Sequence, residues 1–299
     1  MPELPDIELY VAKLRDLLTG VPLSSSRMVS LFILRTVTPS LQELAGHRVR
    51  SVERLGKRVV LGFQDTDARI VIHLMVSGRF LWRAVGANPP PKITMAVFSF
   101  PHGQLVLTEA SSKKRASIHV VPNKEALQAM DPGGVEPLEC SPVEFLIALR
   151  KENRTLKRGL TNPRAFSGIG NAYSDEILWA AQLSPLRLTQ SLTDDEGLRL
   201  REAAVATLQT WSARLLDEFA NKFPGPGDVT AFRPDFAVHG KFGKPCPECG
   251  NKVQRIVYAE NETNYCAECQ LEGRILADRS LSRLLKSDWP RSLEEMEGL

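Results

Sequence analysis

Apolar residues at helical spacing mark the first segment of the chain. They recur every three or four residues, which places them on one face of a helix. Pro5 suits the first turn of a helix, because its missing N–H has no partner there in any case. Gly20 stands where a helix commonly ends. The pattern predicts a helix over residues 5–19, whose apolar face consists of Ile7, Val11, Leu14 and Leu18.

From about Met28 to Val121 the pattern changes to short β-rich runs between Gly, Pro and charged turns. Such runs are typical of a sandwich of two sheets. A Pro- and Gly-rich stretch over residues 131–142 then reads as a linker, and helical patterns follow it. The predicted strands are 51–55, 59–63, 70–74, 95–100, 104–107 and 118–121, and the predicted helices are 143–153, 172–182, 194–219 and 277–286.

Composition limits the kind of protein. The chain has 299 residues, of which 24% are charged and 43% hydrophobic, and this is ordinary for a globular protein of about two domains. Its net charge of +3 neither requires nor excludes a polyanionic partner. It has no apolar run of membrane-spanning length and no signal peptide. We therefore expect a cytoplasmic protein without a membrane partner.

Four of the five cysteines form two Cys-x-x-Cys pairs separated by sixteen residues. This spacing fits four thiolates around one structural zinc ion on a β-hairpin. Redox-active thiols and an iron site are alternatives, but no cofactor motif stands beside the pairs. We expect one structural zinc per chain, bound by Cys246, Cys249, Cys266 and Cys269.

The amino terminus carries candidate covalent chemistry. Removal of Met1 before a small residue leaves Pro2 with a free secondary amine. An α-amino group has a pKa of roughly 7.7–8.0, so part of it is neutral at pH 7. Such an amine can form an iminium with an electrophilic carbon, and Glu3 could move protons beside it. The alternative is an acidic helix start capped by proline, without chemistry.

Two further features lie in the helical half. Basic residues between Arg150 and Arg158 would share one face if the segment were helical. A glycine-rich turn leads into a helix near Asn171, which is an arrangement that can bind phosphate. A solvated charged face and a plain helix–turn–helix with an Asn cap are the respective alternatives.

These pieces occur together and in order over about residues 1–270. The amino-terminal Pro-Glu-Leu-Pro, the Gly-Ile-Gly-Asn-x-Tyr turn and the two-knuckle finger resemble the formamidopyrimidine-DNA glycosylase/endonuclease VIII family. The resemblance implies an α+β fold, with an N-terminal β-sandwich and flanking helix, and a C-terminal helix-two-turn-helix domain that carries a zinc β-hairpin. The expected limits are 1–130 for the sandwich, 131–142 for the linker, 143–235 for the helical domain, 236–270 for the zinc finger and 271–299 for an extension.

The resemblance also implies roles for single residues. Pro2 would attack C1′ of a damaged nucleotide, and Glu3 would be its acid/base partner. Lys57 would assist β-elimination and bind phosphate, and Asn171 would hold phosphate beside the extruded nucleotide. Damaged DNA is then the expected partner of a monomer, associated with the nucleoid if the source is bacterial.

The sequence departs from the family where lesion and opposite base are contacted. Asn261 occupies the place of the finger Arg. The gap-probing stretch is replaced by one that contains Lys113, Lys114 and Arg115. In the strand expected over 73–78, Val76 falls where the void-filling Met usually stands, with Met75 one place early. The 219–235 region and the residues after Cys269 also differ.

The chemistry-bearing residues are therefore present, and the lesion contacts are altered. We interpret the chain as a divergent glycosylase and abasic-site lyase that nicks by β-elimination. A non-excising protein that binds damaged DNA or abasic sites, with a structural zinc finger, is the alternative. A zinc-ribbon scaffold would explain the finger but not the amino terminus. The sequence leaves the excised lesion open.

Overall fold

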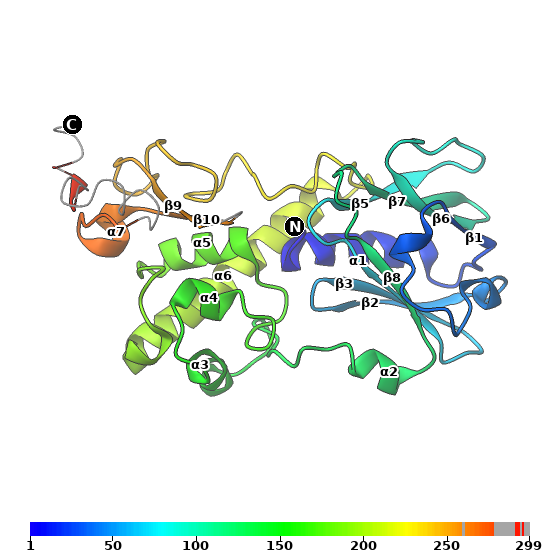
Figure 1. The fold of residues 1–299 in the computed structure, drawn as a ribbon, viewed down its shortest axis with the longest axis horizontal. Helices are drawn as coiled ribbons and strands as arrows, with labels where there is room; N and C mark the ends of the chain where they lie inside the picture. The colour runs from blue at the N-terminus through cyan, green and yellow to red at the C-terminus, as the bar shows by residue number, and fades with distance from the viewer. Residues whose placement is uncertain (259–260, 278–290, 294, 296–299) are drawn as a thin grey trace. The chain divides into compact units, whose positions relative to one another are not determined.

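The computed structural model divides the chain into two compact units. The first comprises residues 1–132 and 211–231, and the second comprises 133–210 and 232–299. The structure describes all residues except 259–260, 278–290, 294 and 296–299 (Figure 1). The helix expected over 277–286 therefore lies almost entirely outside the described residues.

Two four-stranded sheets form the body of the first unit. One sheet has the order β1-β6-β7-β5, the other has the order β2-β3-β4-β8, and all neighbouring strands are antiparallel. Apolar side chains of both sheets share one buried core, including Ile72 from one sheet and Phe98 from the other. The predicted sandwich is confirmed. Its strands are β1 (Ser25–Met28), β2 (Val49–Leu55), β3 (Arg58–Phe63), β4 (Arg69–His73), β5 (Gly78–Arg83), β6 (Thr94–Phe100), β7 (Gly103–Glu109) and β8 (Ser117–Val121).

Helices flank this sandwich. Helix α1 (Leu4–Leu18) buries Ile7, Leu14 and Leu18 in the shared core, as the spacing predicted. The end of α6 (Asp194–Glu218) and the segment after it belong to the same unit. There Phe219 packs with Leu9 of α1 in a small buried cluster. The short elements of this unit are α2 (Lys124–Gln128), η1 (Leu31–Ile33) and η2 (Leu41–Leu44).

The second unit is helical, with one hairpin. Helix α5 begins directly after a turn in which Gly168 has a φ of 80°, a conformation that favours glycine. Strands β9 and β10 pair antiparallel, with Asn261 opposite Tyr258. The elements are α3 (Pro142–Arg150), α4 (Leu156–Leu160), α5 (Asn171–Ala180), η3 (Thr189–Ser191), β9 (Gln254–Tyr258), β10 (Asn261–Tyr265) and α7 (Ala267–Leu271).

The segment from Arg150 to Arg158 is not one helix, so the condition for a single basic helix face is not met. Helix α3 ends at Arg150, and α4 begins only at Leu156. The intervening backbone instead pairs with residues 185–189: the Leu156 N–H donates to the Arg187 carbonyl at 2.7 Å, and the Thr189 N–H donates to the Arg154 carbonyl at 2.7 Å. Arg150 and Lys157 therefore belong to different helices.

The strand expected over 73–78 is wrong. Strand β4 ends at His73, and residues 74–77 form a turn that leads into β5 of the other sheet. The Gly78 N–H donates to the Leu74 carbonyl at 2.8 Å, and Met75 has a positive φ of 52°. A Cβ on residue 78 would lie 2.3 Å from the Leu74 carbonyl oxygen, so this close approach requires glycine.

Candidate functional site: a four-cysteine centre, a buried amino terminus and two exposed loops

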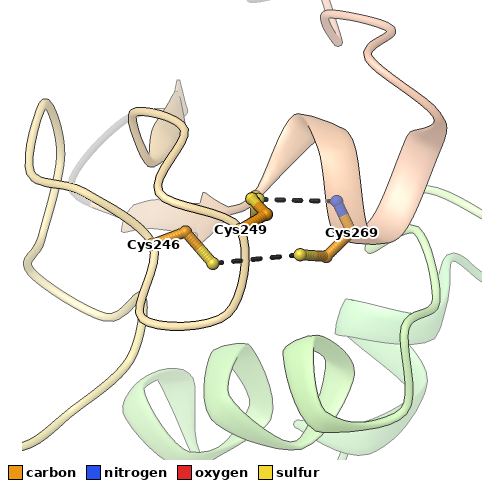
Figure 2. Close-up of side chains that lie close together, drawn as sticks. Cys246, Cys249 and Cys269 are labelled. Carbon is orange, nitrogen blue, oxygen red and sulfur yellow. Dashed lines mark hydrogen bonds between the residues drawn. The ribbon is translucent and has the colours of Figure 1, made fainter.

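The four predicted cysteines converge at one point of the second unit. Their sulfur atoms all lie within 4.8 Å of one another. The Cys246 and Cys269 sulfurs are 3.9 Å apart (Figure 2), and those of Cys249 and Cys266 are 3.4 Å apart. Tetrahedral zinc with Zn–S bonds of about 2.3 Å would place neighbouring sulfurs roughly 3.8 Å apart. The donor set therefore fits one zinc ion.

Local backbone geometry builds this centre. Gly250 follows the first knuckle with a φ of 77°, and its N–H donates to the Cys246 carbonyl at 2.9 Å. The second knuckle starts at Cys266, the N-cap of α7. Trp179 of α5 donates its indole N–H to the Cys246 sulfur at 3.4 Å, which fixes that ligand from outside the centre. The finger is thus attached to the helix that follows the glycine turn.

The amino-terminal residues Pro2 and Glu3 are buried. Glu3 is the N-cap of α1, and its backbone N–H donates to the Asp6 carboxylate at 2.9 Å. Asp6 is itself 2% exposed. Helix α1 therefore holds the Glu3 backbone in one position, beside the residue proposed as the nucleophile.

Charges of both signs surround the terminal amine. Burial lowers the pKa of the Met1 amino group; the carboxylates of Glu3 and Asp6 oppose this effect, and the cations Arg79 and Lys57 add to it. Lys57 lies in the two-residue turn between β2 and β3, where Gly56 has a φ of 60°. Burial likewise lowers the pKa of the Lys57 ammonium, against Glu3 and Asp6. A lowered pKa leaves more of each amine neutral, which suits nucleophilic and basic roles.

The turn over 74–78 presents Val76 at its tip. The Val76 side chain is 51% exposed, whereas Met75 is only partly exposed. The Met75 N–H donates to His73 Nδ1 at 3.0 Å, so this nitrogen carries no proton. Burial, Arg58, Lys57 and His119 lower the pKa of His73 to about 4, and the imidazole is neutral at pH 7.

The basic loop between β7 and β8 exposes Lys113, Lys114 and Arg115. The Lys114 ammonium donates to the Glu109 carbonyl. Glu109 is 1% exposed, and its carboxylate accepts backbone hydrogen bonds from Arg115 and Ala116. The buried Glu109 carboxylate thus binds the backbone of the loop that carries the exposed cations.

Asn171 is the first residue of α5, whose N-cap is Gly170, so the Asn cap considered as an alternative is wrong. The Asn171 amide donates to the Glu262 carbonyl of β10 at 2.9 Å. Lys157 donates to the Asn171 carbonyl at 2.5 Å. The turn into α5, helix α4 and the zinc hairpin therefore meet at Asn171. Of Asn261, the structure describes the backbone at the start of β10.

A buried polar cluster supports this region, and the sequence patterns did not indicate it. Asp175 is 1% exposed, and its two carboxylate oxygens contact Lys157 Nζ at 2.5 Å and His239 Nδ1 at 2.7 Å. Asn264 of β10 donates to the same carboxylate at 3.5 Å. The neighbouring Glu176 accepts the backbone N–H groups of residues 237–239. The one sequence signal that could have indicated this cluster is the adjacent pair Asp175-Glu176 on α5.

Arg79 is the other site residue that sequence reasoning missed. Its guanidinium donates to the carbonyls of Val76, Gly78 and Val229, the last at 2.6 Å. It also acts electrostatically on the terminal amine. Arg79 directly follows Gly78, and no spacing or motif distinguishes it from a surface arginine.

Three family models match successive parts of the chain. Residues 1–115 match the formamidopyrimidine-DNA glycosylase N-terminal domain, and residues 134–213 match the H2TH domain of the same enzyme. Residues 243–271 match the zinc finger found in FPG and IleRS. The α+β fold class and the structural zinc predicted from the sequence are thereby confirmed.

Curated relatives match about nine-tenths of this chain. The formamidopyrimidine-DNA glycosylase of Cytobacillus firmus is 30% identical over 279 residues, which are 91% of this chain and 100% of that protein. That of Heliobacterium modesticaldum is 31% identical over 278 residues, 90% of this chain and 100% of that protein.

A solved structure shows the same fold. The Lactococcus lactis enzyme, non-covalently bound to DNA containing an AP site, is 25% identical with a TM-score of 0.78, over 90% of this chain and 99% of that one. Across the described part of our chain, none of the helices has the length and hydropathy needed to span a bilayer. On the strength of the three domain matches and the full-length relatives, the chain belongs to the formamidopyrimidine-DNA glycosylase family.

Proposed function

We propose that the protein is a base-excision repair DNA glycosylase with AP lyase activity, and that Pro2 is its nucleophile. The observation that carries the assignment of Pro2 is its burial at the start of α1, next to Glu3 and beside a Met1 amino group whose pKa is lowered by burial, with charges of Glu3, Arg79, Asp6 and Lys57 acting on that position. Damaged DNA is the substrate, as the AP-site DNA bound to the Lactococcus lactis relative supports.

The reaction runs in two stages. The base must leave the helical stack before an amine can reach C1′. The Pro2 nitrogen forms a bond to C1′ as the glycosidic bond breaks, and the base leaves with the bonding electrons and takes up a proton from water. Glu3 accepts the proton of the Pro2 nitrogen and delivers it to the ring oxygen as the bond between C1′ and that oxygen breaks, which leaves the iminium. A base, for which Lys57 is our candidate, then removes a C2′ proton, and the 3′ phosphate leaves by β-elimination.

The remaining predicted residues hold DNA in this scheme. Asn171, at the start of α5, and Asn261, on the zinc hairpin, contact backbone phosphates; such contacts position DNA without reading its sequence. Val76 and Met75 enter the gap left by the extruded nucleotide, and the basic loop lies against the opposite strand. The zinc ion acts structurally, by holding the hairpin between its two knuckles. The enzyme acts on DNA as a monomer in the cytoplasm, at the nucleoid if the source is bacterial.

Borohydride trapping on DNA with an abasic site tests the nucleophile. Protein processed to Pro2 should form a stable covalent adduct with the DNA, and the same protein with an uncleaved amino-terminal tag should form none. Equal trapping by the two forms would assign the attack to a lysine instead. Binding of the same DNA without an adduct from either form would favour the alternative, a protein that binds damage but does not excise it.

A further inference from the structure

Two exposed segments of the first unit meet at a single buried carboxylate. Glu109, at the end of β7, is 1% exposed. Its Oε1 accepts from the Arg115 N–H at 3.0 Å and from the Ser77 hydroxyl at 3.2 Å. Its Oε2 accepts from the N–H groups of Arg115 and Ala116 at 3.0 and 3.1 Å. One side chain thus contacts both the basic loop and the turn that presents Val76.

The backbone on either side strengthens this link. Glu109 stands opposite Gly78 in the β5–β7 ladder, so the turn and the basic loop start from adjacent positions of one sheet. The Glu109 N–H donates to the Ile93 carbonyl at 2.8 Å, which fixes the end of the strand. On the turn side, Arg79 donates to the Val76 carbonyl at 3.2 Å.

The chemistry of the two segments is complementary to a disrupted duplex. The turn offers a small apolar side chain, Val76, and the loop offers three consecutive cations, Lys113, Lys114 and Arg115. Apolar side chains can enter an unstacked base step, and cations contact phosphate. Val76 and the three cations can contact one DNA site together only if the distance between the turn and the basic loop is fixed.

We propose that Glu109 is a positioning residue. It holds the Val76 turn and the basic loop at a fixed distance from each other, so that both contact the strand opposite the lesion. The inference rests on the proposed function and extends it, because it assigns the preference for the opposite base to a group that does not touch DNA. Glu109 acts through Ser77 and through the backbone of residues 115–116.

Glu109→Gln is the sharpest perturbation. The amide keeps the shape of the side chain but has a single acceptor oxygen, and its NH₂ group would face an N–H donor. Ser77→Ala removes only the link to the turn, and Glu109→Asp keeps the charge on a shorter arm. Glu125→Gln on α2 is the matched control, since this carboxylate is exposed and lies outside the site.

The assay compares duplexes that carry an abasic site opposite each of the four bases with the same strand unpaired. We expect the Glu109→Gln protein to bind and trap the duplexes roughly tenfold more weakly. Its binding and trapping of single-stranded DNA should change by less than about twofold. The differences between the four opposite bases should shrink, Ser77→Ala should move in the same direction by less, and Glu109→Asp should recover part of the loss.

Two results would overturn the proposal. An equal loss on duplex and single strand would show that Glu109 only stabilises the fold, and thermal unfolding of the variant would then show a matching loss. Unchanged duplex activity and opposite-base preference would show that the link has no effect. A wild-type protein that binds but never traps would refute the lyase assignment instead, and the duplex-to-single-strand binding ratio of the variants would still decide the role of Glu109.

Discussion

Replacing Asp175 by Asn should strongly destabilise the second unit. Asp175 lies on α5, and its carboxylate contacts Lys157 Nζ at 2.5 Å, with 9% of the lysine side chain exposed and none of the aspartate side chain. The other oxygen lies 2.7 Å from His239 Nδ1. The amide in Asp175→Asn would leave the Lys157 ammonium buried without its counter-charge, and would turn an NH₂ group toward one of the two partners.

The magnitude follows from that stranded charge. Removing one partner of a buried ion pair typically costs about 3–5 kcal/mol. Asn still offers one acceptor oxygen, so we expect a cost near the lower limit, roughly 3 kcal/mol. At roughly 2–4 °C per kcal/mol for a chain of this size, the unfolding midpoint should fall by roughly 6–12 °C. Because Lys157 also donates to the Asn171 carbonyl, affinity for abasic-site DNA should fall as well.

Urea and thermal unfolding measure the effect, with Asp217→Asn on the exposed face of α6 as control. Adding Lys157→Met to Asp175→Asn removes the stranded charge and should recover at least about 1 kcal/mol. A loss below about 1 kcal/mol in the single variant, or no recovery in the double variant, would refute the view that this buried pair supports the cluster.

Three further predictions concern other parts of the site. Cys249→Ser should lower the zinc content measured after dialysis and weaken DNA binding, and an unchanged zinc content would contradict the four-thiolate centre. Asn261→Arg should raise the δ-elimination product over the β-product on a gel that resolves both ends, because Arg restores a permanent positive charge. The pKa of His73 is about 4 in the folded protein and 6.5 when unperturbed, so the unfolded chain binds more protons between these pH values. The free energy of unfolding should therefore fall as the pH drops from 7 to 5. His73→Gln should lose less stability over that range in urea titrations.

Features with a local signal could be predicted from the sequence. The apolar residues of α1 recur every three or four positions, and each Cys-x-x-Cys knuckle of the zinc centre spans only four residues. Strands β3, β4 and β6 are mostly buried apolar runs and were predicted within one residue at either end. Strand β1, which is polar and lies at a sheet edge, gave no such signal before Met28.

Features with an ambiguous local pattern, and features made by distant contacts, could not be predicted. The turn after β4 has a sequence that reads as a continuing strand, because Leu74, Met75 and Val76 are all apolar. The chain reverses there because the His73 ring accepts the Met75 N–H and because Gly78 approaches Leu74 closely. Likewise Asp175 and His239 stand 64 residues apart, and only the fold shows that they are partners.

The residues expected to carry out the reaction and those expected to differ from the family lie on different parts of the fold. Pro2 and Glu3 stand at the start of α1, and Lys57 occupies a two-residue turn between paired strands, so the fold holds all three. The residues expected to differ from the family lie on the Val76 turn, on the basic loop and at Asn261, the first residue of β10. Loops on a fixed scaffold can vary in this way while the reaction is kept. The hydrogen bonds of Glu109 and Arg79 anchor the basic loop and the Val76 turn to this scaffold. A preference for the base opposite the lesion should therefore depend as much on these buried anchors as on the exposed residues they hold.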